Sequence, residues 1–102
     1  IYSAILTDIK KQPEFLDFFL SQNYPNPFNP ETIINFTIPM RAEATLKIFD
    51  VLGREIEVLL NEIIQPGKHS AKFNGDKYSS GIYYYQLRTE SFIKTMKMIL
   101  IK

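Results

Sequence analysis

The chain has 102 residues, among them no cysteine, no tryptophan and a single histidine, His69. Without cysteine it can form neither a disulfide nor a thiolate metal site, so its fold must be held by packing alone. Its four glycines are spread singly, which excludes a glycine-rich phosphate-binding loop. No apolar run reaches the length that spans a bilayer, and we therefore expect no membrane insertion.

The chain also has no large excess of charge of either sign, because 12 Lys and Arg are balanced by 11 Asp and Glu and the net charge is +1. A nucleic-acid partner would require a concentrated basic surface with stacking aromatics. Tyr83, Tyr84 and Tyr85 with Arg88 imitate such a platform, but strand alternation places two of the three tyrosines on the buried face. We expect no nucleic-acid partner.

Catalytic groups are scarce as well. His69 has Ser70 as its neighbour, but adjacent strand residues point to opposite faces, so the two cannot act as base and nucleophile. Glu55 and Glu57 share the polar face of an expected strand, where solvated carboxylates are the usual finding. We predict no enzymatic activity, no cofactor and no metal site, and instead a binding, anchoring or assembly module.

What the chain does have is Phe and Tyr in abundance and stretches of alternating polarity. Hydrophobic residues make up 45% and aromatic residues 14%, values typical of one globular domain rich in β-structure. The alternation predicts an all-β sandwich, with Gly53 supplying a positive φ in the turn of one hairpin. Strands are expected over residues 32–38, 44–50, 55–60, 69–73, 82–87 and 92–102.

The same alternation predicts which side chains form the core. The last strand carries apolar residues on both faces of its second half, which indicates an internal or partly covered strand. The inward residues are expected to be Ile34, Phe36, Ile38, Ala44, Leu46, Ile48, Ile56, Val58, Leu60, Tyr83, Tyr85, Leu87, Met96, Met98 and Leu100.

Residues 21–30, "SQNYPNPFNP", place three prolines within six positions, among asparagines and two aromatics. A flexible spacer would not need Tyr24 and Phe28, and a proline-rich ligand would offer only Pro27 and Pro30 with no basic flank. We therefore interpret the segment as a corner of the fold. The aromatics would pin it to the sandwich, and the asparagine side chains would close local turns.

Several blocks occur together in one order: "NYPNPFNP", "DVLGRE", "PGKHSAKFNG", "SSGIYYYQ" and a lysine-flanked apolar terminus. In this combination residues 20–102 resemble the type A sorting domain of the type IX secretion system, which ends many exported proteins of Bacteroidetes and related phyla. The residues that carry the resemblance are Asn23, Tyr24, Pro25, Asn26, Pro27, Phe28, Asn29, Pro30, Asp50, Gly53, Arg54, Gly81 and Tyr83.

The resemblance implies an immunoglobulin-like antiparallel β-sandwich of about seven strands that is itself non-catalytic. It further implies passage through the periplasm and an extracellular or outer-membrane-surface location. The expected partners are the type IX secretion machinery and a surface sortase. On this interpretation the final strand carries the export signal, through Lys94, Lys97, Met98, Leu100 and Lys102.

Residues 1–19 have no counterpart in that family, and we divide the chain into an N-terminal extension, 1–19, and a sandwich, 20–102. Residues 1–10 alternate like a strand. They could be the remainder of a cargo or linker, an extra strand of the same sandwich, or a strand donated to a neighbouring molecule. The third alternative predicts an extracellular fibre, a homopolymer joined by strand exchange. Its donor residues would be Ile1, Tyr2, Ile5, Leu6 and Ile9.

Overall fold

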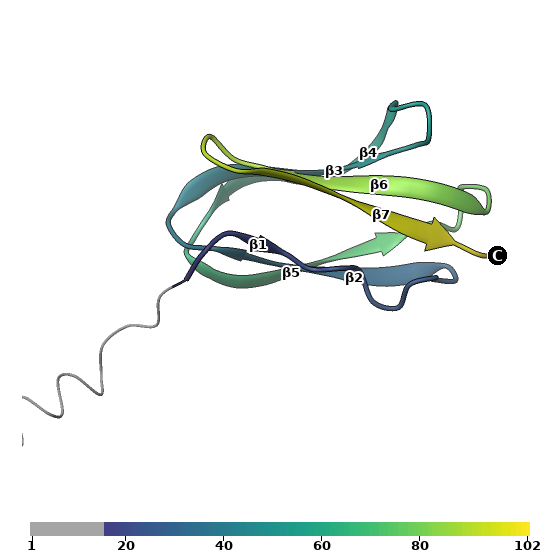
Figure 1. Ribbon diagram of the computed structural model, residues 1–102, viewed down its shortest axis with the longest axis horizontal. Helices are drawn as coiled ribbons and strands as arrows, with labels where there is room; N and C mark the ends of the chain where they lie inside the picture. Colours follow the sequence, from purple (N-terminus) through teal and green to yellow (C-terminus); the bar gives the residue numbers. More distant parts are fainter. Residues whose placement is uncertain (1–15) are drawn as a thin grey trace, which may run out of the picture.

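The computed structural model describes residues 16–102, which form two antiparallel sheets packed face to face (Figure 1). The predicted all-β fold of about seven antiparallel strands is confirmed, while its immunoglobulin-like detail stays a prediction. The strands are β1 (Phe19–Leu20), β2 (Glu31–Ile38), β3 (Ala42–Phe49), β4 (Glu55–Ile64), β5 (Gly67–Asn74), β6 (Gly81–Arg88) and β7 (Ile93–Leu100).

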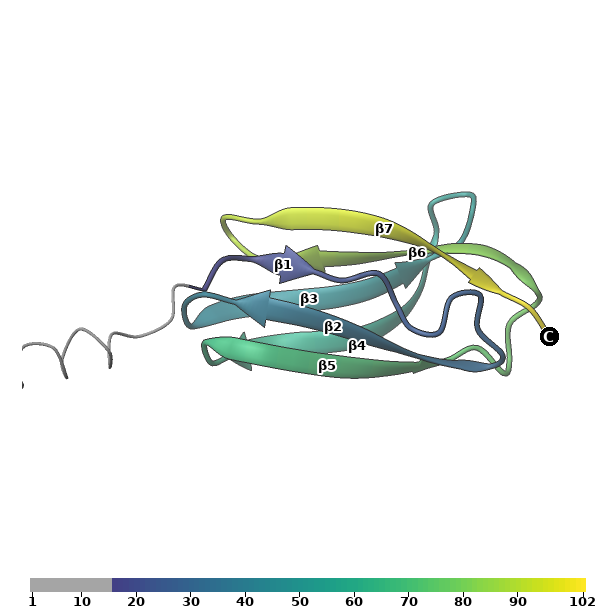
Figure 2. The same cartoon turned by 60° about the horizontal axis from the view of Figure 1, so that its bottom comes forward.

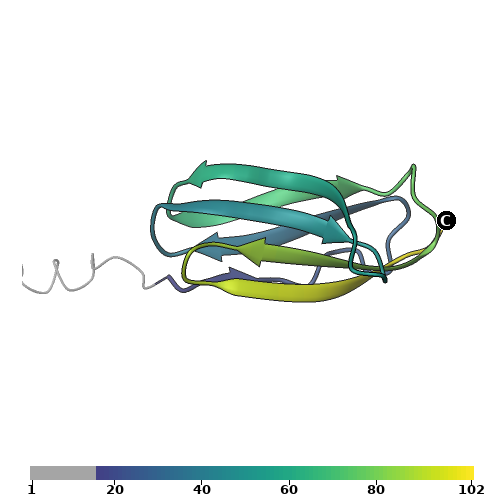
Figure 3. The same ribbon diagram turned by 90° about the horizontal axis from the view of Figure 1, so that it is seen from above.

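One sheet has the order β1-β2-β5 and the other the order β4-β3-β6-β7 (Figures 2 and 3). The chain passes between the sheets after β2, after β4 and after β5, so neither sheet is a continuous stretch of sequence. Short loops therefore gather at the two ends of the sandwich. Neighbours in sequence and neighbours in space differ, which is why the alternation alone could not assign the pairing.

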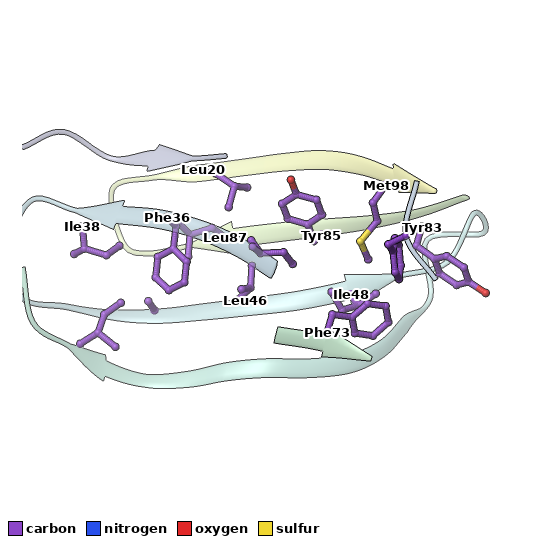
Figure 4. Packing of buried hydrophobic residues seen from close by; sticks show 14 of the residues in the cluster. Leu20, Phe36, Ile38, Leu46, Ile48, Phe73, Tyr83, Tyr85, Leu87 and Met98 are labelled. Carbon is purple, nitrogen blue, oxygen red and sulfur yellow. The ribbon is translucent and has the colours of Figure 1, made fainter. Parts of the chain in front are cut away.

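The core lies between the sheets and is built from alternate residues of each strand (Figure 4). The inward faces of β2, β3 and β6 are buried as predicted, and Tyr85 and Phe73 are among the largest fully buried side chains. Met98 and Leu100 of β7 close the core on one side. Burial of these apolar side chains is the main stabilising term of a chain that has no cross-link.

The predicted inward face of β4 is wrong at Val58, whose side chain is 44% exposed. The register between β3 and β4 shifts twice, between Leu46 and Lys47 and between Ile48 and Phe49. Each such bulge interrupts the alternation, so the side chains beyond it change face. Glu57 is partly buried, and its carboxylate accepts a hydrogen bond from the hydroxyl of Tyr78 at 2.8 Å.

Tyr85 joins the two sheets through its hydroxyl. The side chain extends from β6 and is fully buried. Its hydroxyl donates to the carbonyl of Ser21 and accepts the backbone N–H of Asn23 at 2.8 Å. Burial raises the pKa of Tyr85 to about 12, because the charged phenolate would have to be desolvated. A neutral phenol therefore holds the chain just after β1 against the opposite sheet.

Replacing Tyr85 with Phe is expected to lower the free energy of unfolding by about 1–3 kcal/mol, measured by urea denaturation at pH 7. The ring still fills the core, but the carbonyl of Ser21 and the N–H of Asn23 lose their partner in the interior. Tyr24→Phe is the matched control, because that ring is 78% exposed. An unchanged stability for Tyr85→Phe would contradict this role of the hydroxyl.

The raised pKa of Tyr85 also predicts alkaline sensitivity. Below pH 10 the phenol is neutral in both states, and its contribution to stability is fully present. Between about pH 10 and 12 the unfolded chain loses this proton and the folded chain keeps it, so stability falls as the pH rises. Urea denaturation across this pH interval should show that the free energy of unfolding declines less steeply for Tyr85→Phe than for the wild type. Parallel declines would contradict the raised pKa of Tyr85.

Candidate recognition site at one end of the sandwich

Three segments that are far apart in sequence meet at one end of the sandwich, which we call the motif-bearing end. They are the proline-rich segment (residues 22–30), the β5–β6 loop (residues 75–80) and the end of the chain (residues 99–102) (Figures 1 and 2). Phe28 donates its N–H to the carbonyl of Ile99 at 2.9 Å and accepts the N–H of Ile101 at 2.9 Å. The proline-rich segment is thus paired with the C-terminal strand.

Phe28 is the residue that anchors this segment. It is 1% exposed, and its ring meets that of Phe73 edge-on with 5.9 Å between the centroids. Tyr24 does not share the role that we predicted for both aromatics. Its backbone pairs with Ile33 of β2, but its side chain is 78% exposed on the outer side of the sheet. The corner is therefore pinned by a single aromatic ring.

The asparagine side chains bind both local and distant partners. Asn23 is 2% exposed, and its side-chain amide donates to the carbonyl of Pro25 at 3.1 Å and to the hydroxyl of Thr32 at 3.0 Å. The Asn26 side chain accepts the N–H of Ile99 at 3.0 Å, across the gap to β7. The prediction of a local turn is wrong for Asn26, because its side-chain oxygen accepts an N–H of the neighbouring strand instead.

The proline-rich segment also covers part of the edge of β7. On one side β7 pairs with β6 along its whole length, from Ile93 to Leu100. On the other side the carbonyl of Lys97 accepts a hydrogen bond from the side chain of Gln22 at 2.8 Å, and Ile99 is bound by Asn26 and Phe28. The predicted partly covered strand is confirmed, and the uncovered part of its edge lies before Lys97.

The five residues predicted to carry the export signal divide into two groups. Met98 and Leu100 are buried in the core, whereas Lys94 and Lys97 are exposed. Lys102 is also exposed, but it is bound to the β5–β6 loop: its N–H donates to the hydroxyl of Ser80 at 2.9 Å and its ammonium donates to the carbonyls of Asp76 and Tyr78. A partner that contacts the folded domain would meet the lysines of β7 and not its apolar face.

Gly75 is a residue at this end that the sequence analysis missed. A Cβ at this position would lie 2.9 Å from Cδ2 of Leu100 and 3.3 Å from Cε2 of Phe28. Its N–H also donates to the carbonyl of Pro30 at 2.8 Å. The sequence "NGD" indicates only a loop, and no local pattern could have shown that two core side chains press against it.

The "DVLGRE" block forms the β3–β4 loop, residues 50–54, and Asp50 organises it. One carboxylate oxygen accepts the N–H groups of Leu52 and Arg54, each at 2.9 Å, and the other binds the guanidinium of Arg54 at 2.8 Å. The backbone N–H of Arg54, followed by its guanidinium and the N–H of Leu52, holds the pKa of Asp50 below its usual value. Gly53 has the predicted positive φ, 79°.

Gly81 and Tyr83 also lie at the motif-bearing end, where β6 begins. Gly81 has a φ of 155°, and no atom lies within 4 Å of the position that a Cβ would take. Tyr83 is 8% exposed, and its hydroxyl donates to the carbonyl of Ser79 at 2.6 Å. Together with Lys102 it fixes the β5–β6 loop, so the family residues of β6 support this loop and do not form a pocket of their own.

The remaining candidate residues, His69 and Glu55, are engaged in contacts within the sandwich. His69 stacks on Phe36 with 5.5 Å between the ring centroids and lies 2.7 Å from the carbonyl of Gln65. Glu55 forms a salt bridge with Lys47 at 3.0 Å. Within residues 16–102 there is no group of three or more His, Asp or Glu suited to holding a metal ion. In the same residues no helix is long and apolar enough to cross a membrane.

The donor-strand residues Ile1, Tyr2, Ile5, Leu6 and Ile9 lie outside the described residues. Strand donation and the fibre that it would build therefore stay predictions. The division of the chain into residues 1–19 and 20–102 is likewise a prediction. Among the residues that the structure describes, Phe18 stacks on Phe92 with 4.8 Å between the ring centroids, and Phe19 pairs with Thr37 of β2.

Comparison with known proteins identifies a family and a similar solved structure. The sequence model described as "Secretion system C-terminal sorting domain" matches residues 22–102. A structure of PorZ, a bacterial surface component of the type IX secretion system of Porphyromonas gingivalis, is similar with a TM-score of 0.53 and 22% identity. The similarity covers 83% of this chain and only 11% of PorZ, so it concerns the fold of one part of that protein. No curated protein matches the chain.

Replacing Phe28 with Ala is expected to lower the free energy of unfolding by about 3–5 kcal/mol, because a fully buried ring is removed next to Phe73. The matched control is Phe19→Ala, whose side chain is 59% exposed and which should change stability by less than about 0.5 kcal/mol. Chemical denaturation of both variants measures the difference. Equal small losses would mean that the corner is not anchored by Phe28.

Replacing Gly75 with Ala is expected to lower the free energy of unfolding by about 1–3 kcal/mol, because the added methyl group must displace Leu100 or Phe28 in the core. Ser79→Ala in the same loop is the control, since that residue is exposed. Thermal denaturation followed by circular dichroism compares the two variants. A Gly75→Ala protein as stable as the control would show that the two core side chains can move aside without loss.

Proposed function

The chain belongs to the family of secretion-system C-terminal sorting domains, and we propose that it is the export signal of a protein that leaves the cell by type IX secretion. The observation that carries the proposal is the match over residues 22–102, which includes every strand from β2 to β7. The family is non-catalytic, and the proposal accordingly assigns no enzymatic activity to the domain. The domain would act by being recognised.

The two ends of the sandwich would have different roles, one joined to the cargo and the other recognised by the export machinery. The chain enters β1 at one end, where Phe18 stacks on Phe92 of the β6–β7 turn. The motif-bearing end lies at the opposite end, where β7 finishes (Figure 1). A folded cargo upstream of Phe18 would therefore leave the motif-bearing end accessible to the export machinery.

The recognised features in this proposal are those that a partner can reach in the folded state. On β7 these are the side chains of Lys94 and Lys97 and the uncovered edge before Lys97. Met98 and Leu100 contribute indirectly, because their burial holds the strand in register with β6. The sorting strand would thus be presented as part of a rigid edge.

Location and partners follow from the same proposal. The cargo would pass through the periplasm and the outer membrane and arrive at the cell surface or outside the cell. The secretion machinery is the first partner. A surface sortase is a second one, and it would cut the chain on the cargo side of the sandwich, before β1.

The proposal is tested with a reporter protein fused upstream of Leu20 and produced in a bacterium that has a type IX system. We expect the reporter in the medium or on the cell surface, and we expect it to be retained in an isogenic strain whose type IX machinery is inactive. The reporter without residues 20–102 is the control and should stay inside in both strains. Export that is independent of the machinery, or retention of the fusion in both strains, would overturn the proposal.

A further inference from the structure

The β3–β4 loop is a rigid turn that exposes two aliphatic side chains. Asp50 fixes the loop through three hydrogen bonds to Leu52 and Arg54, and the N–H of Gly53 donates to the carbonyl of Asp50 at 3.0 Å. Nevertheless Val51 is 63% exposed and Leu52 is 73% exposed. The turn depends on Asp50 and Gly53, and polar residues at 51 and 52 would serve its geometry equally well. Two adjacent aliphatic residues on a fixed loop therefore require another reason.

A hollow of about 320 Å³ lies beside this loop on the outer face of the β4-β3-β6-β7 sheet. Figures 1 and 3 show the loop rising from that sheet at the motif-bearing end. The side chains of Gln86 and Thr95 are joined by a hydrogen bond of 3.0 Å in the hollow. Most of its surface is apolar, and its lining comes from the loop, β3, β6 and β7: Phe49, Asp50, Val51, Gly53, Tyr84, Gln86 and Thr95.

The charge around the hollow that remains available to a partner is positive. The acids on this side are already neutralised, because Glu55 binds Lys47 and Asp50 binds Arg54. Lys97 lies opposite the lining residue Tyr84 in the β6–β7 ladder, and is therefore next to the hollow. Within the part of the chain that the structure describes, Lys97 forms no salt bridge. An apolar hollow with an unneutralised cation at its rim complements an apolar side chain flanked by carboxylates.

We propose that this hollow, together with Val51 and Leu52, docks a protein of the export machinery through an apolar side chain flanked by acidic residues. The inference rests on the proposed function and adds a second contact to it, on the sheet face, which shares Lys97 with the presented lysines of β7. Loop and strand reach the hollow from distant parts of the sequence, so only the folded domain presents the complete surface. The docking step would consequently discriminate a folded sorting domain from an unfolded one.

The test uses the reporter fusion with the double substitution Val51→Ser/Leu52→Ser. We expect export to fall about tenfold, because two apolar residues at the centre of an interface are lost. The matched control is Met40→Ser/Ile63→Ser, a pair that is 58% and 52% exposed at the opposite end of the sandwich. Thermal denaturation of the purified domains checks that both double variants are folded. If the Val51→Ser/Leu52→Ser variant is destabilised, the single variant Leu52→Ser replaces it, and we expect its export to fall about threefold.

A second substitution tests the charge. Lys97→Glu should lower export about as strongly, whereas Lys68→Glu, an exposed position on β5, should leave export unchanged. Wild-type export by the variants at 51 and 52 would overturn the docking inference and leave the proposed function intact. A loss of export confined to Lys97→Glu would do the same, because Lys97 also belongs to the presented lysines of β7. Failure of the wild-type fusion itself would overturn the proposed function, and the inference with it.

An anionic membrane is the alternative occupant of a basic, apolar surface, and vesicles distinguish it from a protein. The purified domain is sedimented with vesicles of phosphatidylcholine and phosphatidylglycerol at low and physiological salt. We expect no binding that depends on Val51, Leu52 or Lys97. Vesicle binding that is lost in these variants in parallel with export would assign the surface to the membrane and overturn the proposed protein partner.

Discussion

The structure depends on one short segment that is bonded to both sheets. Phe19 and Leu20 pair with β2, and eight residues later Phe28 pairs with β7 in the other sheet. Between them the backbone is tied to the hydroxyl of Tyr85. The sandwich has no disulfide, and at this side the two sheets are held together by this segment, which pairs with a strand of each sheet. The buried ring of Phe28 fixes its far end, and Gly75 leaves the space that this ring and Leu100 occupy.

This clamp determines how the C-terminal strand is presented. An edge strand with apolar residues on both faces would be an aggregation hazard if it were left open. Here the last residues of β7 are bonded by Asn26 and Phe28, while the lysines Lys94 and Lys97 occupy its exposed part. The proline-rich block and the terminal block are thus two halves of one structural unit. Their joint occurrence in the sequence has a physical reason, because neither is stable in this geometry without the other.

The family block that forms the β3–β4 loop contributes to neither clamp nor core. Its internal hydrogen bonds make it stiff, and its aliphatic residues face solvent beside an apolar hollow. Stiffness without burial is expected of a surface that binds, since a preorganised loop loses little entropy when it is covered. The domain therefore combines two surfaces of different character, a basic partly covered edge and an apolar hollow, in adjoining positions on one sheet.

Local sequence was sufficient for the strands and for most of the core. Alternation of period two is a property of the chain itself, so Ile34, Leu46, Tyr85 and Met98 could be assigned to the interior before any pairing was known. The blocks of the family could likewise be located. Tertiary structure decided the rest. The bulges that turn Val58 outward and the opposite placement of Phe28 and Tyr24 arise from contacts between distant segments. So do the space at Gly75 and the hollow at Tyr84, because cross-strand register is set by the packing of both sheets together and leaves no trace in a local pattern.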